Sequence, residues 1–132
     1  MIAGMGVDLA EVSRFAILLS RFGYRAAEKI LGVEERDQFS SASRQDVFIA
    51  KRWAVKEAFG KALGTGIAQG VTLPQIQVCY GSSGEPGLVF DGAAEQVLSA
   101  RNIDRHYVSI SDERLADGST LVCAVVILER SS

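Results

Sequence analysis

The alternation of apolar and polar residues along the chain predicts several short elements around one long helix. Ile2–Ala10 is apolar except for Asp8 and is typical of a strand. Arg44–Leu63 contains no proline, is rich in helix-forming residues and is followed by glycine, so it is the longest predicted helix. Shorter helices are predicted from an N-cap at Ser13 to Phe22 and over three further ranges: Tyr24–Leu31, Val33–Phe39 and Ala93–Arg101.

The second half of the chain has the pattern of strands. Val71–Tyr80 alternates apolar and polar residues after its proline, which predicts a strand, and Leu88–Phe90 predicts a short one. Tyr107–Ser111 and Leu121–Leu128 are expected to form a hairpin, because a polar loop with Asp117-Gly118 joins them. Helices thus alternate with strands that are mostly linked as hairpins. This order predicts an α+β fold, with a small antiparallel or mixed sheet packed on one long helix and shorter helices.

Composition narrows the class of protein. A length of 132 residues predicts a single domain over residues 1–132, and 48% hydrophobic residues suffice for a core. The net charge of −2 gives no indication of binding to nucleic acid or to a membrane. Cys79 and Cys123 have no redox or metal-binding spacing and are expected to be reduced core thiols. Met1–Leu9 is too short and too broken by glycine for a signal sequence, so a cytoplasmic protein is expected.

Asp8 is the first residue that simple packing does not explain. It lies in the segment Gly6-Val7-Asp8, inside an otherwise apolar strand. Burial of a lone carboxylate is costly, so the side chain should be paired, hydrogen-bonded, at the end of the strand or bound to a metal. The residues by themselves leave these alternatives open.

A second unusual segment lies in the long helix. Helical spacing places three of its residues one turn apart on one face: Trp53, Glu57 and Lys61. Arg52 and Lys56 form a neighbouring stripe. Such a Glu–Lys pair is most often a solvated bridge. The loop that follows, Gly64-Thr65-Gly66, is expected to offer free backbone amides, and the combination suits a site for phosphate and metal. No Gly-Lys-Ser/Thr follows, so the loop is not a Walker A motif.

Together these motifs resemble the 4′-phosphopantetheinyl transferase superfamily, and within it the short holo-acyl-carrier-protein synthases. The resemblance runs along most of the chain, through Gly6-Val7-Asp8-Leu9, Phe48–Ala58, Lys61–Ile67, Gly84-Glu85-Pro86 and Val108-Ser109-Ile110-Ser111. Larger two-domain members have Asp-x-Glu at the first motif, whereas this chain has Asp8-Leu9-Ala10. The missing second acid favours the short branch.

The resemblance implies a reaction and a cofactor. Phosphopantetheine is transferred from coenzyme A to a serine of apo-acyl carrier protein, adenosine 3′,5′-bisphosphate is released, and the product serves fatty-acid biosynthesis. Mg²⁺ is the implied cofactor, with Asp8 and Glu57 as its ligands. Glu57 and Lys61 are the implied catalytic residues. The proton of the acceptor serine would pass either to Glu57 or to a metal-bound water.

Binding residues follow from the same resemblance. Arg52 is a candidate for the 3′-phosphate of coenzyme A, because guanidinium suits phosphate well; Arg44 and Lys51 are weaker candidates. Lys61 and the turn and loop residues Gly64, Thr65, Gly66 and Pro86 would line the nucleotide cleft. A basic stripe on the first helix suits the acidic carrier protein; the predicted docking residues are Arg14, Leu18, Arg21, Phe22 and Arg25. A homotrimer with active sites between subunits is implied.

Two departures and two alternatives remain. Many relatives carry Ser-x-Ser-His on the penultimate strand, where this chain has Asp112, so the role of that histidine cannot be transferred. His106, the one histidine of the chain, is expected to be structural or on the surface. A coenzyme A- or nucleotide-binding module without transferase activity would be favoured if Asp8 or Glu57 were missing. A metal-dependent pyrophosphohydrolase would have more clustered acids and no basic docking helix.

Overall fold

The computed structural model describes residues 1–131 and contains a run of helices between strands at the two ends of the chain. The elements are β1 Ile2–Glu11, α1 Val12–Phe22, α2 Tyr24–Ile30, α3 Val33–Ser40, α4 Gln45–Leu63, the short 3-10 helix η1 Leu73–Gln75, β2 Ile76–Tyr80, β3 Pro86–Phe90, α5 Gly92–Ala100, β4 Arg105–Arg114 and β5 Thr120–Glu129.

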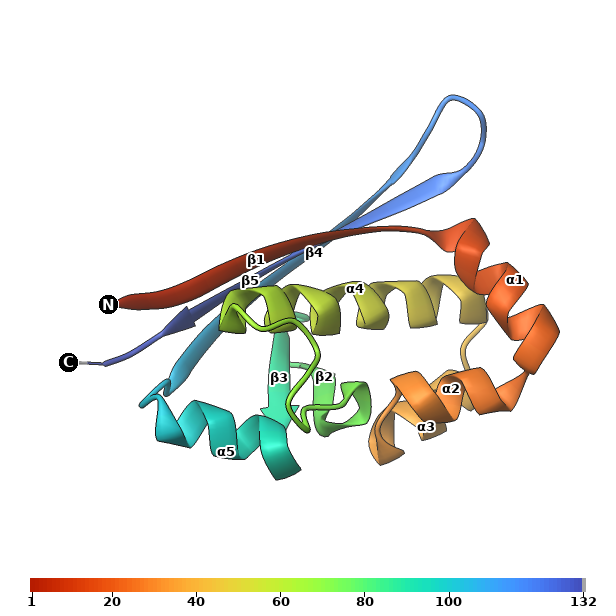
Figure 1. The fold of residues 1–132 in the computed structure, drawn as a ribbon. Helices are drawn as coiled ribbons and strands as arrows, with labels where there is room; N and C mark the ends of the chain where they lie inside the picture. Colours follow the sequence, from red (N-terminus) through yellow and green to blue (C-terminus); the bar gives the residue numbers. More distant parts are fainter. Residues whose placement is uncertain (132) are drawn as a thin grey trace.

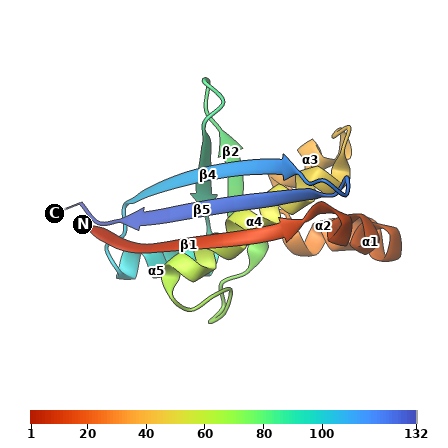
Figure 2. The same ribbon diagram turned by 90° about the horizontal axis from the view of Figure 1, so that it is seen from above.

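Helix α4 lies between two layers (Figure 1). On one side it packs along β1 and β5 of a three-stranded antiparallel sheet with strand order β1-β5-β4. On the other side it contacts α2, α3 and β2, the last of which pairs with β3 in a separate two-stranded antiparallel sheet. Figure 2 shows the three long strands running side by side above α4. The predicted α+β class, with a small antiparallel sheet on one long helix, is confirmed.

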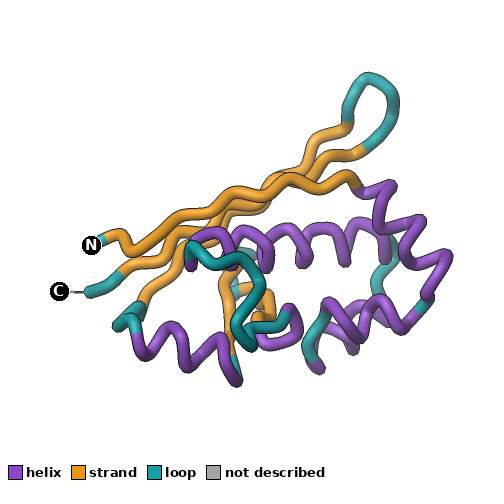
Figure 3. The backbone as a smooth tube through the Cα atoms, in the orientation of Figure 1, coloured by secondary structure: helices purple, strands orange, loops and turns teal. Residues whose placement is uncertain are grey.

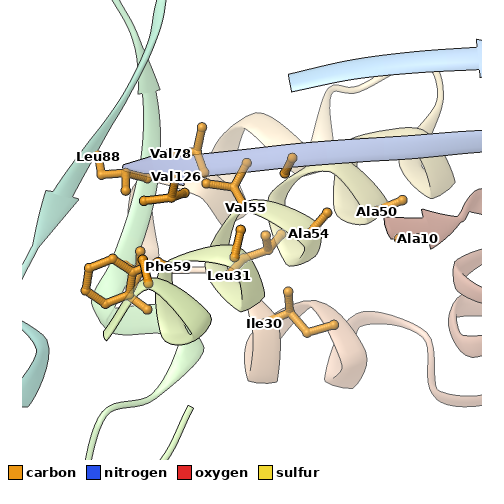
Figure 4. Packing of buried hydrophobic residues seen from close by; sticks show 14 of the residues in the cluster. Ala10, Ile30, Leu31, Ala50, Ala54, Val55, Phe59, Val78, Leu88 and Val126 are labelled. Atoms are coloured by element: carbon orange, nitrogen blue, oxygen red, sulfur yellow. The ribbon is translucent and has the colours of Figure 1, made fainter. Parts of the chain in front are cut away.

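The hydrophobic core surrounds α4. Val55 and Phe59 of this helix are fully buried, and Figure 4 shows them between Val126 of the large sheet and residues of the lower layer such as Ile30 and Leu31. Because both layers cover it, α4 is apolar over most of its circumference rather than along one stripe. Glu57 and Lys61 lie on a face of α4 that neither layer fully covers.

Most predicted elements occur close to their expected bounds, as the tube view also shows (Figure 3). The strand predicted over Val71–Tyr80 is too long: Leu73–Gln75 form η1, and β2 begins at Ile76. The hairpin of β4 and β5 is confirmed. The N-cap of α1 was predicted wrongly: Glu11 is the N-cap, and α1 begins at Val12 without a side-chain cap, because it continues directly from β1. The expected buried thiols are also wrong in part, since Cys79 is exposed and Cys123 is half-buried, although both are free.

Within residues 1–131, no helix has the length and apolar character needed to span a membrane.

Candidate active site

Asp8 lies on the face of β1 that packs against α4. Gly4 and Gly6 share this face, because alternate residues of a strand point the same way. A Cβ atom on Gly6 would lie 2.0 Å from the carbonyl oxygen of Ala58, and one on Gly4 would lie 1.9 Å from that of Ala62. Only glycine therefore lets β1 approach the C-terminal half of α4 so closely. The close approach places Asp8, which is 8% exposed, against the helix.

Lys61 of α4 holds one oxygen of the Asp8 carboxylate. Its Nζ donates to Asp8 Oδ1 at 2.9 Å and to the carbonyl oxygen of Val7 at 3.0 Å. The other carboxylate oxygen, Oδ2, is buried and has no hydrogen-bond partner among residues 1–131. A buried carboxylate oxygen without a donor is costly, so its presence indicates that a further electropositive group completes the site.

Glu57 precedes Lys61 by one turn of α4 and is half-buried. Burial raises the pKa of the Glu57 carboxyl and the negative charge of Asp8 raises it further, whereas Lys61 and Arg14 oppose the rise. The effect of Asp8 on Glu57 means that the fold brings two acids that are far apart in sequence into one site. The basic charge of Arg14 reaches the same place from α1.

The two acids form a donor set suited to a small divalent cation. Mg²⁺ usually takes one or two protein carboxylates and fills its other positions with water and phosphate oxygens. Asp8, with its unpaired Oδ2, and Glu57 fit this pattern. Among residues 1–131 no group of three or more His, Cys, Asp or Glu side chains could hold a metal ion alone. A cation held here would therefore take its remaining ligands from water and substrate.

Arg52 is placed in a buried ion-pair cluster, which conflicts with its predicted contact to the 3′-phosphate. Its Nε lies 3.4 Å from Glu35 Oε2, and its guanidinium carbon lies 3.6 Å from the centre of the Phe48 ring. Lys56 is fully buried in the same cluster and donates to Glu35 Oε1 at 2.5 Å. Burial lowers the pKa of Lys56 to about 8, and Glu35 opposes this change. Arg52 and Lys56 thus neutralise Glu35, and neither faces solvent.

The loop after α4 lacks two of the free amides that its sequence predicted. The N–H of Gly64 donates to the carbonyl oxygen of Lys61 at 3.0 Å, and the N–H of Gly66 donates to that of Gly60 at 2.9 Å. Gly64, at φ +84°, ends α4 as a left-handed C-cap. The end of the helix therefore occupies both amides, because its last carbonyl groups need donors. The Thr65 hydroxyl donates to the Gly66 carbonyl oxygen at 3.1 Å.

Arg44 and Pro86, also predicted to contact coenzyme A, lie on other parts of the fold. Arg44 is the N-cap residue of α4 and forms an exposed ion pair with Asp46 at 3.2 Å. The rise of the helix separates Arg44 from Lys61 by about 25 Å, so one copy of the chain cannot bring both to one phosphate group. Pro86 begins β3, where it pairs with Tyr80.

The predicted docking residues lie on two helices. Arg14 and Arg21 belong to α1, whereas Gly23, at φ +55°, separates α1 from α2, which carries Arg25. The two helices enclose a cavity of about 310 Å³, lined by Leu18, Phe22, Arg25, Ala26, Lys29 and Ile30. An apolar hollow with a basic rim therefore adjoins the arginine stripe.

Comparison with known proteins adds to this geometry. Residues 4–124 match the family model of the 4′-phosphopantetheinyl transferase superfamily. The chain belongs to this superfamily. A holo-[acyl-carrier-protein] synthase of Laribacter hongkongensis is 47% identical over 86% of this chain and 91% of that protein. One from Vibrio cholerae serotype O1 (strain M66-2) is 43% identical over 98% of this chain and 99% of that protein. The resemblance found in the sequence is confirmed.

Solved structures of this superfamily share the fold. The holo-[acyl-carrier-protein] synthase of Neisseria meningitidis is 35% identical, has a TM-score of 0.90, and covers 98% of this chain and 100% of its own. The synthase of Bacillus anthracis str. Ames, solved in complex with CoA (3′,5′-ADP), is 32% identical with a TM-score of 0.73, over 99% of each chain.

Two polar residues near the sheet have structural partners. His106 Nε2 accepts a hydrogen bond from the Leu88 N–H at 3.0 Å, so the imidazole is neutral and ties β4 to β3. Its ring meets Phe90 edge-on. Asp112 lies 3.9 Å from the Lys51 ammonium.

Two features of the site were missed by the sequence reasoning. Glu35 was interpreted only as part of a short acidic helix, although the adjacent stripe of Arg52 and Lys56 signalled that buried cations need a buried acid. The electrostatic effect of Arg14 on Glu57 was also missed, since its helix was assigned to docking alone. Both depend on how α1, α3 and α4 pack together, which local patterns do not contain.

Proposed function

We propose that this chain uses a divalent cation, held by Asp8 and Glu57, to transfer 4′-phosphopantetheine from coenzyme A to a serine of an apo-acyl carrier protein. Transfer to acyl carrier protein is the activity by which the relatives of this superfamily are named. The observation that carries the cation is the buried, unpaired Asp8 Oδ2 beside Glu57. A binding module would have no need for this costly arrangement of acids.

The transfer breaks one bond and forms another. The serine oxygen attacks the phosphorus that bears the pantetheine arm, the pyrophosphate P–O bond breaks, and adenosine 3′,5′-bisphosphate leaves with the electron pair. The serine proton passes to a base. Burial and the charge of Asp8 raise the pKa of Glu57, so its carboxylate is the group of this chain best suited to accept the proton. When bound, Mg²⁺ supplies charge neutralisation on the pyrophosphate.

Lys61 has two tasks in this proposal. Its hydrogen bonds to Asp8 Oδ1 and the Val7 carbonyl oxygen orient the carboxylate that holds the cation. The side chain is 54% exposed, so its ammonium group is also accessible to the phosphates of coenzyme A. Thr65 and the turn that ends at Pro86 remain candidates for the walls of the nucleotide cleft, with Gly64 and Gly66 contributing shape rather than free amides.

The large sheet supports a trimer. Its side opposite α4 exposes large apolar residues of β1, namely Met5, Val7 and Leu9, and Tyr107 of β4. Met5 and Tyr107 flank Ile127 of β5 in register, so these residues form one continuous surface. Exposed apolar surface of this kind favours association, and copies of the same chain are the partners we propose.

Contact between subunits would also allow Arg44 and Lys61, two predicted binding residues that lie far apart in one chain, to serve the same site. Arg44 lies about 25 Å from Lys61 along α4, yet an Arg44 from a neighbouring copy would be free of this restriction. Mixing inactive Arg44→Ala and Lys61→Ala chains should then restore activity in mixed trimers, because some sites combine two unaltered residues. Failure of the mixture to regain activity, with both variants shown to co-assemble, would refute the shared site.

The carrier protein is proposed to dock on α1 and α2. Arg21 and Arg25 offer positive charge to an acidic surface, and the cavity between the helices offers an apolar hollow to a side chain at its centre.

Mass spectrometry of the carrier protein tests the proposed function. The chain should add phosphopantetheine to apo-carrier in the presence of coenzyme A and Mg²⁺, and EDTA should stop the reaction until Mg²⁺ is restored. Asp8→Asn should lose transfer, whereas Asp37→Asn, an exposed acid on α3, should retain it. Hydrolysis of coenzyme A without a modified carrier would favour a pyrophosphohydrolase. Transfer that is indifferent to EDTA and to Asp8→Asn would refute the cation site.

A further inference from the structure

Arg14 and Trp53 form a stack between α1 and α4. The guanidinium carbon of Arg14 lies 4.5 Å from the centre of the Trp53 ring. The Trp53 ring is also packed against the buried Phe15, whose ring centre lies 5.4 Å away at an interplanar angle of 56° and 5.5 Å from the guanidinium carbon of Arg14. A guanidinium held over indole gains cation–π attraction, so the stack limits the otherwise mobile arginine to one region.

The stack has a fixed place relative to the acids of the active site. Trp53 precedes Glu57 by one turn on the same face of α4. Arg14 is therefore held where the basic face of α1 meets the pair formed by Asp8 and Glu57. Its charge acts on Glu57 directly.

The guanidinium edge is left without a partner. Arg14 has no hydrogen bond or ion pair to any side chain or backbone group in the part of the chain that the structure describes. A stacked guanidinium uses its face for the ring and keeps the N–H groups of its edge for a planar acceptor such as a carboxylate. No other arginine of α1 lies over an aromatic ring: Arg21 is exposed and unstacked.

We propose that Trp53 is a positioning residue for the transfer: its ring aims the edge of Arg14 at a carboxylate of the carrier protein, which aligns the acceptor serine with the two acids. The inference rests on the proposed function and adds a residue to it. Trp53 touches neither coenzyme A nor the serine in this account and acts through Arg14. Arg21, by contrast, contributes charge without fixed direction.

Double-mutant cycles test this division of roles. We expect Trp53→Leu to lower kcat/KM for apo-carrier by about 2- to 5-fold, the range of an exposed cation–π contact. The same change should have less than about a twofold effect in an Arg14→Ala background. In an Arg21→Ala background, the matched control, it should keep its full effect. Affinity for 3′,5′-ADP should be equal in all variants.

Two conservative variants keep the test independent of folding. Trp53→Phe retains a ring and should keep most of the activity. Arg14→Lys retains the charge but not the planar edge, and should lose nearly as much kcat/KM as Arg14→Ala. An Arg14→Lys chain with wild-type kcat/KM would overturn the proposal, as would equal losses from Trp53→Leu in both arginine backgrounds.

Fluorescence separates this inference from the proposed function. Trp53 is the single tryptophan of the chain, so its emission reports on the stack. Titration with apo-carrier in the presence of 3′,5′-ADP should change the emission of the wild type and of Arg21→Ala, but not of Arg14→Ala. A wild type that transfers phosphopantetheine with no such change overturns only the role of Trp53. A wild type that transfers nothing overturns the proposed function itself.

Discussion

Removal of the Lys56 ammonium is the sharpest test of what holds α4 in place. Lys56→Met keeps the length of the side chain and deletes its charge. The wild-type Nζ donates to the Ile30 carbonyl oxygen at 2.6 Å and to Glu35 at 2.5 Å, inside the protein. Glu35 also accepts the N–H groups of Gly32 and Val78, both at 3.0 Å. The cluster therefore links α2, α3, α4 and β2.

The size of the effect follows from what remains after the change. Loss of one partner of a buried ion pair costs about 3–5 kcal/mol, since the other charge is left without compensation. Arg52 stays 3.4 Å from Glu35 and retains part of the attraction, so we expect about 3 kcal/mol. Lys51→Met, on the same helix but in a partly exposed pair 3.9 Å long, should cost about 0–1 kcal/mol.

Urea unfolding followed by circular dichroism would measure both variants. All samples need the same protein concentration, because association of folded chains shifts the apparent free energy of unfolding. Equal losses below about 1 kcal/mol for Lys56→Met and Lys51→Met would show that the buried cluster does not hold the layers together, and would refute the reasoning.

Four further outcomes are expected. Glu57→Gln should lower transfer by roughly a thousandfold or more at unchanged circular dichroism, because an amide is a poor cation ligand and base; near-normal transfer would contradict its role. Arg21→Glu should raise KM for apo-carrier at low salt, with the difference shrinking at high salt as charges are screened, and an unchanged KM would exclude docking there. Gly6→Ala should cost about 1–3 kcal/mol of unfolding free energy and most of the activity, since the added Cβ forces β1 away from α4. Gly87→Ala should be tolerated, because a Cβ there would lie 3.6 Å from its nearest neighbour, Cys79 Sγ. Burial lowers the pKa of His106 below its ordinary value of 6.5. The unfolded chain therefore binds the proton more readily, and the stability of the fold decreases as the pH drops below 6.5. In unfolding measurements between about pH 7.5 and about pH 5.5, His106→Gln should lessen this loss of stability.

The sequence predicted the fold well because its helices and strands carry strong local signals. The long helix has no proline and ends at glycine, and the last two strands alternate around a polar turn, so both were found from their own residues. The two acids of the candidate site were singled out for a different reason. Asp8 is an acid in an apolar strand, and Glu57 lies in a motif shared with a known superfamily.

Tertiary packing decided the features that were missed. Arg52 was a plausible phosphate ligand as an arginine on a helix, and only the burial of Glu35 against it shows its structural task. The Gly64 and Gly66 amides were expected to be free, because a glycine loop alone does not reveal that the end of α4 uses them. Trp53 was placed on the correct face, yet its contact with Arg14 requires two helices to cross.

The position of β5 has a consequence for how the chain acquires its active site during synthesis. This strand is the central one of the large sheet and is made after every other described element. Asp8 lies opposite Ala124, so the first strand has no partner until the ribosome has produced nearly all the rest. Until then the backbone edge of β1 that pairs with β5 remains open to chaperones or to other nascent chains. Folding to the active form should therefore be a late event that follows translation of β5, rather than one that proceeds from the N-terminus.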